Sequence, residues 1–85
     1  MSYYDDELAK AQSELERLDG NHSAEAHARK ITLLDHMASV LNDYADEIER
    51  RGHSGHELRQ AGNAMKDHAV EQANEFLRIL ATGSK

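Results

Sequence analysis

The chain has 85 residues, which suffices for one small domain spanning residues 1–85 and excludes a two-domain enzyme. It contains no cysteine and no proline, so disulfides and thiolate metal cages are excluded and nothing in the sequence breaks a long helix. The formal net charge of -6 disfavours binding to a nucleic-acid backbone or to an anionic membrane surface.

The first predicted helix covers residues 2–19. Ser2 is in position to cap it, and Asp5 and Asp6 place negative charge at its positive N-terminal end. Gly20 suits the left-handed residue that ends a helix. Apolar residues at alternating spacings of four and three give this helix one narrow packing face: Tyr4, Leu8, Ala11, Leu15 and Leu18.

The second predicted helix covers residues 23–51. Asn21 or Ser23 can cap it, and Arg50 and Arg51 stand in its last turn, before Gly52, where positive charge is favourable. Its apolar residues cover about half of the circumference, so the helix is expected to contact two neighbours. These residues form two parallel stripes: Ile31, Leu34, Ala38, Leu41, Ala45 and Ile48, and Leu33, Met37, Val40 and Tyr44.

The third predicted helix covers residues 54–82. Ser54 and Glu57 have the spacing of a capping box, and Gly83 follows as the stop. Gly62 inside the helix costs about 1 kcal/mol relative to alanine, so close packing is expected there. The predicted packing face comprises Leu58, Ala61, Gly62, Met65, Ala69, Ala73, Phe76, Ile79 and Leu80.

These elements predict an all-α three-helix bundle in which a short N-terminal helix packs on a long antiparallel helical hairpin. At 1.5 Å per residue, the first helix is about 26 Å long and the other two are about 42 Å each. The first helix is therefore expected to shield the hairpin only as far as Leu41. The hairpin tip would then expose an apolar patch formed by Tyr44, Ala45, Ile48, Leu58, Ala61 and Met65.

Six histidines are the unusual feature of the composition. His53 and His56 stand near Glu57, but a flexible glycine turn offers too few preset ligands, so neither a metal site nor a cofactor is predicted. His27 falls on the packing face of the second helix. A neutral, hydrogen-bonded role is favoured for it, with pH sensing as the alternative. A solvated position is expected for His22, His36 and His68.

The sequence predicts no enzyme and no membrane segment. It has no cysteine nucleophile, no Gly-x-Ser-x-Gly turn and no glycine-rich phosphate loop, and an alanine-rich bundle leaves little volume for a substrate. The acidic start at residues 1–8 is not a secretory leader, and no apolar run is long enough to span a bilayer. A cytoplasmic location is expected, with export without a cleaved leader as an alternative.

The predicted function is protein–protein interaction by a regulator, inhibitor or adaptor of a larger assembly, with homodimerisation through the hairpin tip. Substitution of Ile48 by Asp is expected to abolish this association while leaving the helices formed. The predicted contacts are the apolar anchors Tyr44, Ile48, Leu58 and Met65, with Arg51 and Arg59 as a charged rim.

Three alternatives remain. An acidic nucleic-acid mimic of the phage-inhibitor type would block a DNA- or RNA-binding protein through Asp43, Asp46 and Glu47. A small hairpin or chaperone-like protein of a bacterial secretion system has a similar length, but residues 52–55 lack the Trp-x-Gly turn of one such family. Direct nucleic-acid binding by a dimeric hairpin would require the basic tip to outweigh the overall negative charge.

Overall fold

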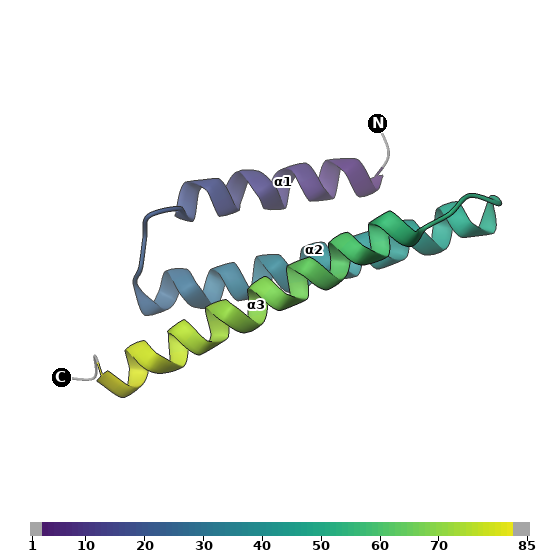
Figure 1. Cartoon of the computed structure of the whole chain (residues 1–85). Helices are drawn as coiled ribbons and strands as arrows, with labels where there is room; N and C mark the ends of the chain where they lie inside the picture. The colour runs from purple at the N-terminus through teal and green to yellow at the C-terminus, as the bar shows by residue number, and fades with distance from the viewer. Residues whose placement is uncertain (1–2, 83–85) are drawn as a thin grey trace.

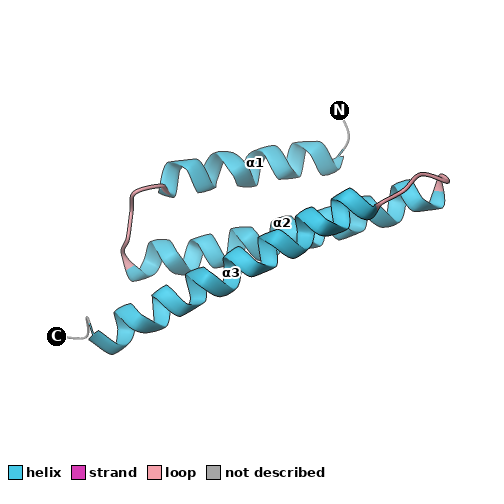
Figure 2. Ribbon diagram, viewed as in Figure 1, coloured by secondary structure: helices cyan, strands magenta, loops and turns pink. Residues whose placement is uncertain are grey.

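The computed structural model describes residues 3–82, and within this range the chain forms three α-helices and no strand (Figures 1 and 2). The helices are α1 (Tyr3–Leu18), α2 (Ala24–Arg50) and α3 (His56–Thr82). α2 and α3 form a long antiparallel hairpin, and the shorter α1 folds back along α2 (Figure 1). The predicted fold class is confirmed.

The turn between α1 and α2 follows the glycine and serine signals of the sequence. Gly20 has a φ of 83°, the left-handed conformation that residues with a side chain disfavour. Ser23 is the N-cap of α2, because its hydroxyl accepts a hydrogen bond from the amide of Ala26 at 3.1 Å. The cap predicted at Ser2 and the stop predicted at Gly83 lie outside the described residues.

The end of α2 is a Schellman motif built on Gly52, which has a φ of 88°. The amide of Gly52 donates to the carbonyl of Glu49 at 3.0 Å, and the amide of His53 donates to the carbonyl of Ile48 at 2.9 Å. These two bonds satisfy carbonyls that the last turn of a helix otherwise leaves unpaired. The chain reverses within a few residues and brings α3 back along α2.

The start of α3 differs from the prediction. The hydroxyl of Ser54 accepts from the amide of His56 at 3.3 Å, and the carbonyl of Gly55 accepts the first helical bond, from the amide of Arg59 at 3.0 Å. The helix therefore begins at His56, two residues later than predicted, and the expected capping box is not the arrangement observed. The reason is that Gly55 is buried against Ala45 of α2, so the chain enters the helix at this close contact.

α2 is the central helix, since it packs against both of the others, whereas the backbones of α1 and α3 do not approach one another. The molecule is a thin rod with principal extents of 54 × 20 × 13 Å. Small residues let α2 and α3 approach closely, because Ala38 and Ala45 are at most 1% exposed. Between residues 3 and 82, no helix combines the length and apolarity needed to cross a bilayer.

α1 is held by a small apolar cluster. Ala11 of α1 packs with Leu33 and Met37 of α2, and Met65 of α3 reaches the same cluster. Ala11 is also the one residue of α1 that is fully buried among those described. The other partly buried members of the cluster lie on α1: Leu8, Leu15 and Leu18.

Candidate functional site

The hairpin tip does not expose the apolar patch expected from the sequence. Tyr4 of α1 stacks on Tyr44 with ring centroids 4.9 Å apart and planes 8° from parallel. α1 therefore reaches one turn beyond Leu41, because it begins at Tyr3 and runs far enough along α2 to meet Tyr44. None of the six predicted patch residues is fully exposed: Ala45 is buried, and Tyr44, Ile48, Leu58, Ala61 and Met65 are half-buried.

The two arginines predicted as the charged rim bind carboxylates of the same chain. Arg59 donates through Nη2 to Asp46 Oδ1 at 2.6 Å and to Glu49 Oε1 at 2.5 Å. The hydrogen bond to Glu49 is the largest cause of a raised pKa at Arg59, and the bond to Asp46 is the second. In turn, the hydrogen bond from Arg59 lowers the pKa of Glu49. Arg51 donates to Glu47 at 3.1 Å. Partner binding by the tip residues stays a prediction.

The predicted acidic surface is partly neutralised within the chain. Asp46 is paired with Arg59, and Glu47 accepts from both Arg50 and Arg51. Asp43 is exposed on the same helix. The arginine partners reduce the negative charge that these three carboxylates present to a partner, because paired charges largely cancel at a distance.

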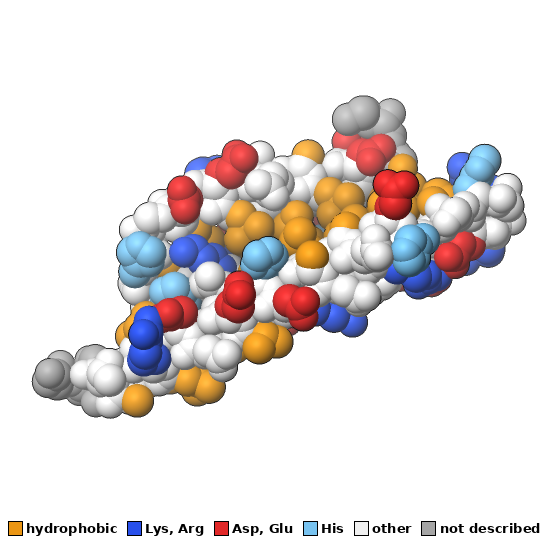
Figure 3. All heavy atoms as spheres, in the orientation of Figure 1, with side chains coloured by type: hydrophobic (Ala, Val, Ile, Leu, Met, Phe, Trp, Pro, Cys, Tyr) orange, Lys and Arg blue, Asp and Glu red, His pale blue; other side chains and the backbone are white. Residues whose placement is uncertain are grey.

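The sequence interpretation missed an exposed apolar face on α3, and it wrongly assigned Leu80 of this face to the predicted packing face. Val70 is 59% exposed, Leu77 is 61% exposed and Leu80 is 50% exposed. With the half-buried Ala73 they follow spacings of three, four and three, the pattern of a helix-packing face. We call Val70, Ala73, Leu77 and Leu80 the outer α3 stripe. Figure 3 shows hydrophobic side chains at the edge of the C-terminal half of α3, apart from those between α1 and α3.

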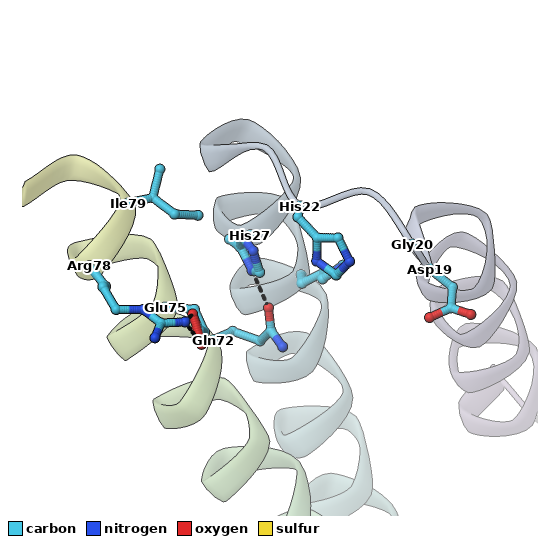
Figure 4. Close-up of a pocket in the computed structure, with 9 residues that line it drawn as sticks. Asp19, Gly20, His22, His27, Gln72, Glu75, Arg78 and Ile79 are labelled. Carbon is cyan, nitrogen blue, oxygen red and sulfur yellow. Dashed lines mark hydrogen bonds and ion pairs between the residues drawn. The ribbon is translucent and has the colours of Figure 1, made fainter. Parts of the chain in front are cut away.

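An open cleft of about 610 Å³ lies where the α1–α2 turn faces the C-terminal half of α3 (Figure 4). His27 is only 5% exposed at its base, and its Nδ1 lies 2.5 Å from Oε1 of Gln72. The ring of His22 stands 6.1 Å from that of His27. The hydrogen-bonded position predicted for His27 is confirmed. The cleft is lined by Asp19, Gly20, His22, His27, Lys30, Gln72, Glu75, Arg78 and Ile79.

Glu75 and Arg78, two of the charged residues of this cleft, pair with one another. The hydrogen bond from Arg78 lowers the pKa of Glu75, and the nearby His27 and His22 act in the same direction. Lys30 donates to the backbone carbonyl of Asn21 at 3.1 Å.

The other histidines lie at the surface. His22, His36 and His68 are exposed, as expected, and His36 contacts Glu7 of α1 at 3.2 Å. His53 and His56 are exposed as well. Across the described part of the chain, no group of three side chains of the kinds that bind metals is placed to hold an ion.

Arginine–glutamate pairs predict sensitivity to acid, and two of them, Arg29–Glu14 and Arg59–Glu49, join different helices. Arg29 of α2 forms two hydrogen bonds with Glu14 of α1, at 2.5 and 2.8 Å. Arginine hydrogen bonds hold the pKa of Glu14, Glu47, Glu49 and Glu75 below the usual value of 4.5. The folded chain thus binds fewer protons than the unfolded chain around that value.

We therefore expect stability to be lost as the pH falls from about 4.5 through the lowered pKa values of these glutamates. The midpoint of urea unfolding, followed by circular dichroism between pH 7 and pH 3, measures this loss. Substitution of Arg29 by Gln should make the dependence shallower, because the pKa of Glu14 then returns toward its usual value. An equal pH dependence for the variant and the original chain would contradict the assignment.

The comparisons with known proteins give no match: no family model, no curated protein and no solved structure corresponds to this chain.

Proposed function

We propose that the chain is a small helical protein-interaction module, a regulator, inhibitor or adaptor of a larger assembly, and that the outer α3 stripe is its docking surface. The observation that carries the proposal is the exposure of Val70, Leu77 and Leu80 along one face of a helix. Exposed apolar patches on soluble domains commonly mark partner surfaces. Anchors at heptad spacing suit the helix-on-helix mode of recognition.

The stripe is a better candidate than the hairpin tip. The apolar residues at the tip are half-buried by the chain itself, and Arg59 is engaged with Asp46 and Glu49. A partner at the tip would have to displace these contacts, whereas a partner at the stripe gains apolar burial without displacing an ion pair. Complete burial of a fully exposed Val or Leu side chain contributes about 1.5 to 3 kcal/mol, and covering these half-exposed side chains contributes about half of that for each.

The cleft supports a binding role less well than the stripe does. Glu75 and Arg78 neutralise one another there, and Gln72 is engaged with His27. The acidic-mimic alternative also has less support, because two of its three carboxylates already have arginine partners.

The proposal is tested by a photo-crosslinking amino acid placed at Leu77 in the full chain, expressed in its native host. Irradiation should give a protein adduct at this position. The matched control carries the same group at Gln60, which is exposed on the same helix outside the stripe, and should not give that adduct. Identical products from the two positions, or no adduct at Leu77, would rule out the stripe as a docking surface.

A further inference from the structure

We infer that Tyr4 and Tyr44 form an oxidative modification site, at which a one-electron oxidant couples the two rings into a dityrosine that locks α1 onto α2. The inference goes beyond the proposed function, because it concerns the contact between α1 and α2 and does not depend on the outer α3 stripe. Its basis is the composition of the chain together with the stacking of the two rings.

Tyrosine is the side chain of this protein that most readily gives up a single electron. Tryptophan and the cysteine thiolate compete with tyrosine in most proteins, but the sequence contains neither. The chain has three tyrosines, and all of them lie in one ring cluster: Tyr3 and Tyr4 on the first turn of α1, and Tyr44 on α2. One-electron oxidation of this chain is therefore directed to the place where α1 meets α2.

Tyr4 and Tyr44 are in contact across the two helices. Their ring centroids are 4.9 Å apart and their planes are 8° from parallel. Carbon atoms in contact lie about 3.5 to 4 Å apart, so the larger centroid separation means that the rings are offset and overlap at their edges. Both side chains are half-buried. Radicals formed on them therefore meet one another before they meet a second molecule.

Tyr3 has a different environment. It is 66% exposed, and its ring meets that of Tyr4 nearly edge-on, with centroids 5.5 Å apart and planes at 74°. Both of these rings belong to α1, so coupling between them would not join two helices. Tyr3 thus offers a matched comparison: the chain holds it as close to α2 as its neighbour, but its ring contact is with Tyr4 and not with Tyr44.

The coupling is a two-electron oxidation carried out in two one-electron steps. Each phenol loses an electron and a proton, so its O–H bond breaks and a phenoxyl radical forms. The two radicals join through the ring carbons next to the oxygen-bearing carbons, and the hydrogen atoms of those ring carbons move to the oxygens, which restores both phenols. A peroxide accepts the two electrons as its O–O bond breaks. Hydrogen peroxide then gives two water molecules, and persulfate gives two sulfate ions and leaves the two protons in the solvent.

The crosslink would hold the end of α1 that the chain itself leaves untethered. The turn at residues 19–23 joins the C-terminal end of α1 to α2, and Tyr4 stands at the opposite end (Figure 1). With both ends held, α1 stays over the apolar cluster that contains Ala11, Leu33 and Met37. Oxidation thus fixes the one helix whose backbone packs only on α2 and that is joined to the hairpin at one end.

Oxidation of the purified full chain by persulfate, activated by photoexcited ruthenium tris-bipyridine, tests the coupling. The monomeric product should be lighter by two hydrogen atoms, show dityrosine fluorescence and yield on proteolysis a peptide that joins α1 to α2. Methionine oxidation adds oxygen instead, so mass distinguishes the two products. Crosslinks formed only between chains would overturn the inference.

Two phenylalanine variants test the assignment to the stacked pair. Tyr4→Phe should lower the yield of the joined peptide about tenfold or more, because Tyr44 then loses the phenol that is held in contact with it. Tyr3→Phe is the matched control and should leave the yield nearly unchanged. Equal yields from the two variants would show that closeness along the chain, and not the stack, governs the coupling.

Hydrogen exchange of the crosslinked monomer tests the lock. Peptides from α1 should exchange about tenfold more slowly, or slower still, than in the unmodified chain, because local opening of α1 is then blocked at both of its ends. Peptides from the middle of α3 serve as the internal reference and should change less. Equal exchange of α1 before and after crosslinking would contradict the lock.

Discussion

Gly55→Ala is expected to lower the free energy of unfolding by about 1 to 3 kcal/mol. A methyl group at this position would lie 2.8 Å from Oε2 of Glu49, 3.0 Å from Cβ of Ala45 and 3.0 Å from the carbonyl oxygen of Ala45. The glutamate side chain can rotate away, but the backbone of α2 cannot move without separating the hairpin helices. The loss is large for a chain of this size, whose core contributes only about 3 to 5 kcal/mol. Urea unfolding followed by circular dichroism measures it.

Gly62→Ala is the control inside α3, seven residues after Gly55, which directly precedes the helix. A methyl group there meets the carbonyl oxygen of Ala38 and Oδ1 of Asn42 at 3.5 Å, which is ordinary contact. Because alanine is the better helix former, this variant should gain about 0.5 to 1 kcal/mol. A gain in stability at Gly55 like that at Gly62 would show that the contact with Ala45 does not control the effect at Gly55.

Ala11→Asp is expected to detach α1 from the hairpin. Ala11 is 4% exposed in the cluster with Leu33 and Met37, so a carboxylate there would be buried against apolar side chains. The cations that line the adjacent groove, Lys10, Arg29 and His36, are already paired with Glu7 and Glu14. Burying an unpaired charge costs several kcal/mol, which exceeds what the thin α1–α2 contact can offset. An isolated helix of 16 residues is only marginally stable in water, so the released α1 should also lose its helical structure.

Hydrogen exchange followed by mass spectrometry measures this effect. Peptides from α1 in Ala11→Asp should exchange at nearly the rate of an unfolded chain, while peptides from α2 and α3 keep their protection. Ser13→Asp is the control, since Ser13 is exposed on the same helix and the variant should keep α1 protected. Loss of protection throughout α2 and α3 would contradict independent docking of α1.

The helices and most of their ends could be predicted from local signals. Gly20 and Gly52 adopt the left-handed conformation, and Ser23 caps α2. Each of these features depends on residues within one helical turn, so the local sequence is enough to predict it. The start of α3 could not be predicted in this way, because it depends on the contact of Gly55 with Ala45, ten residues earlier in the chain and on another helix.

The candidate site could be predicted from the sequence less well than the fold. Helix lengths gave the extent of α1 but not its offset along α2, and the stacking of Tyr4 on Tyr44 shows that α1 reaches further than expected. The spacing of Val70, Ala73, Leu77 and Leu80 was visible in the sequence. It was obscured by a second apolar face on the same helix, and only the three-dimensional packing shows which of the two faces α2 covers.

The central position of α2 has a consequence for folding kinetics. Every pair of helices with closely packed backbones is consecutive in the chain, so no helix must wait for a distant segment before it can dock. Topologies of such low contact order fold on the microsecond-to-millisecond timescale. With no proline in the chain, prolyl isomerisation contributes no slow phase. Refolding of the single chain should therefore finish in milliseconds, ahead of any step that depends on protein concentration.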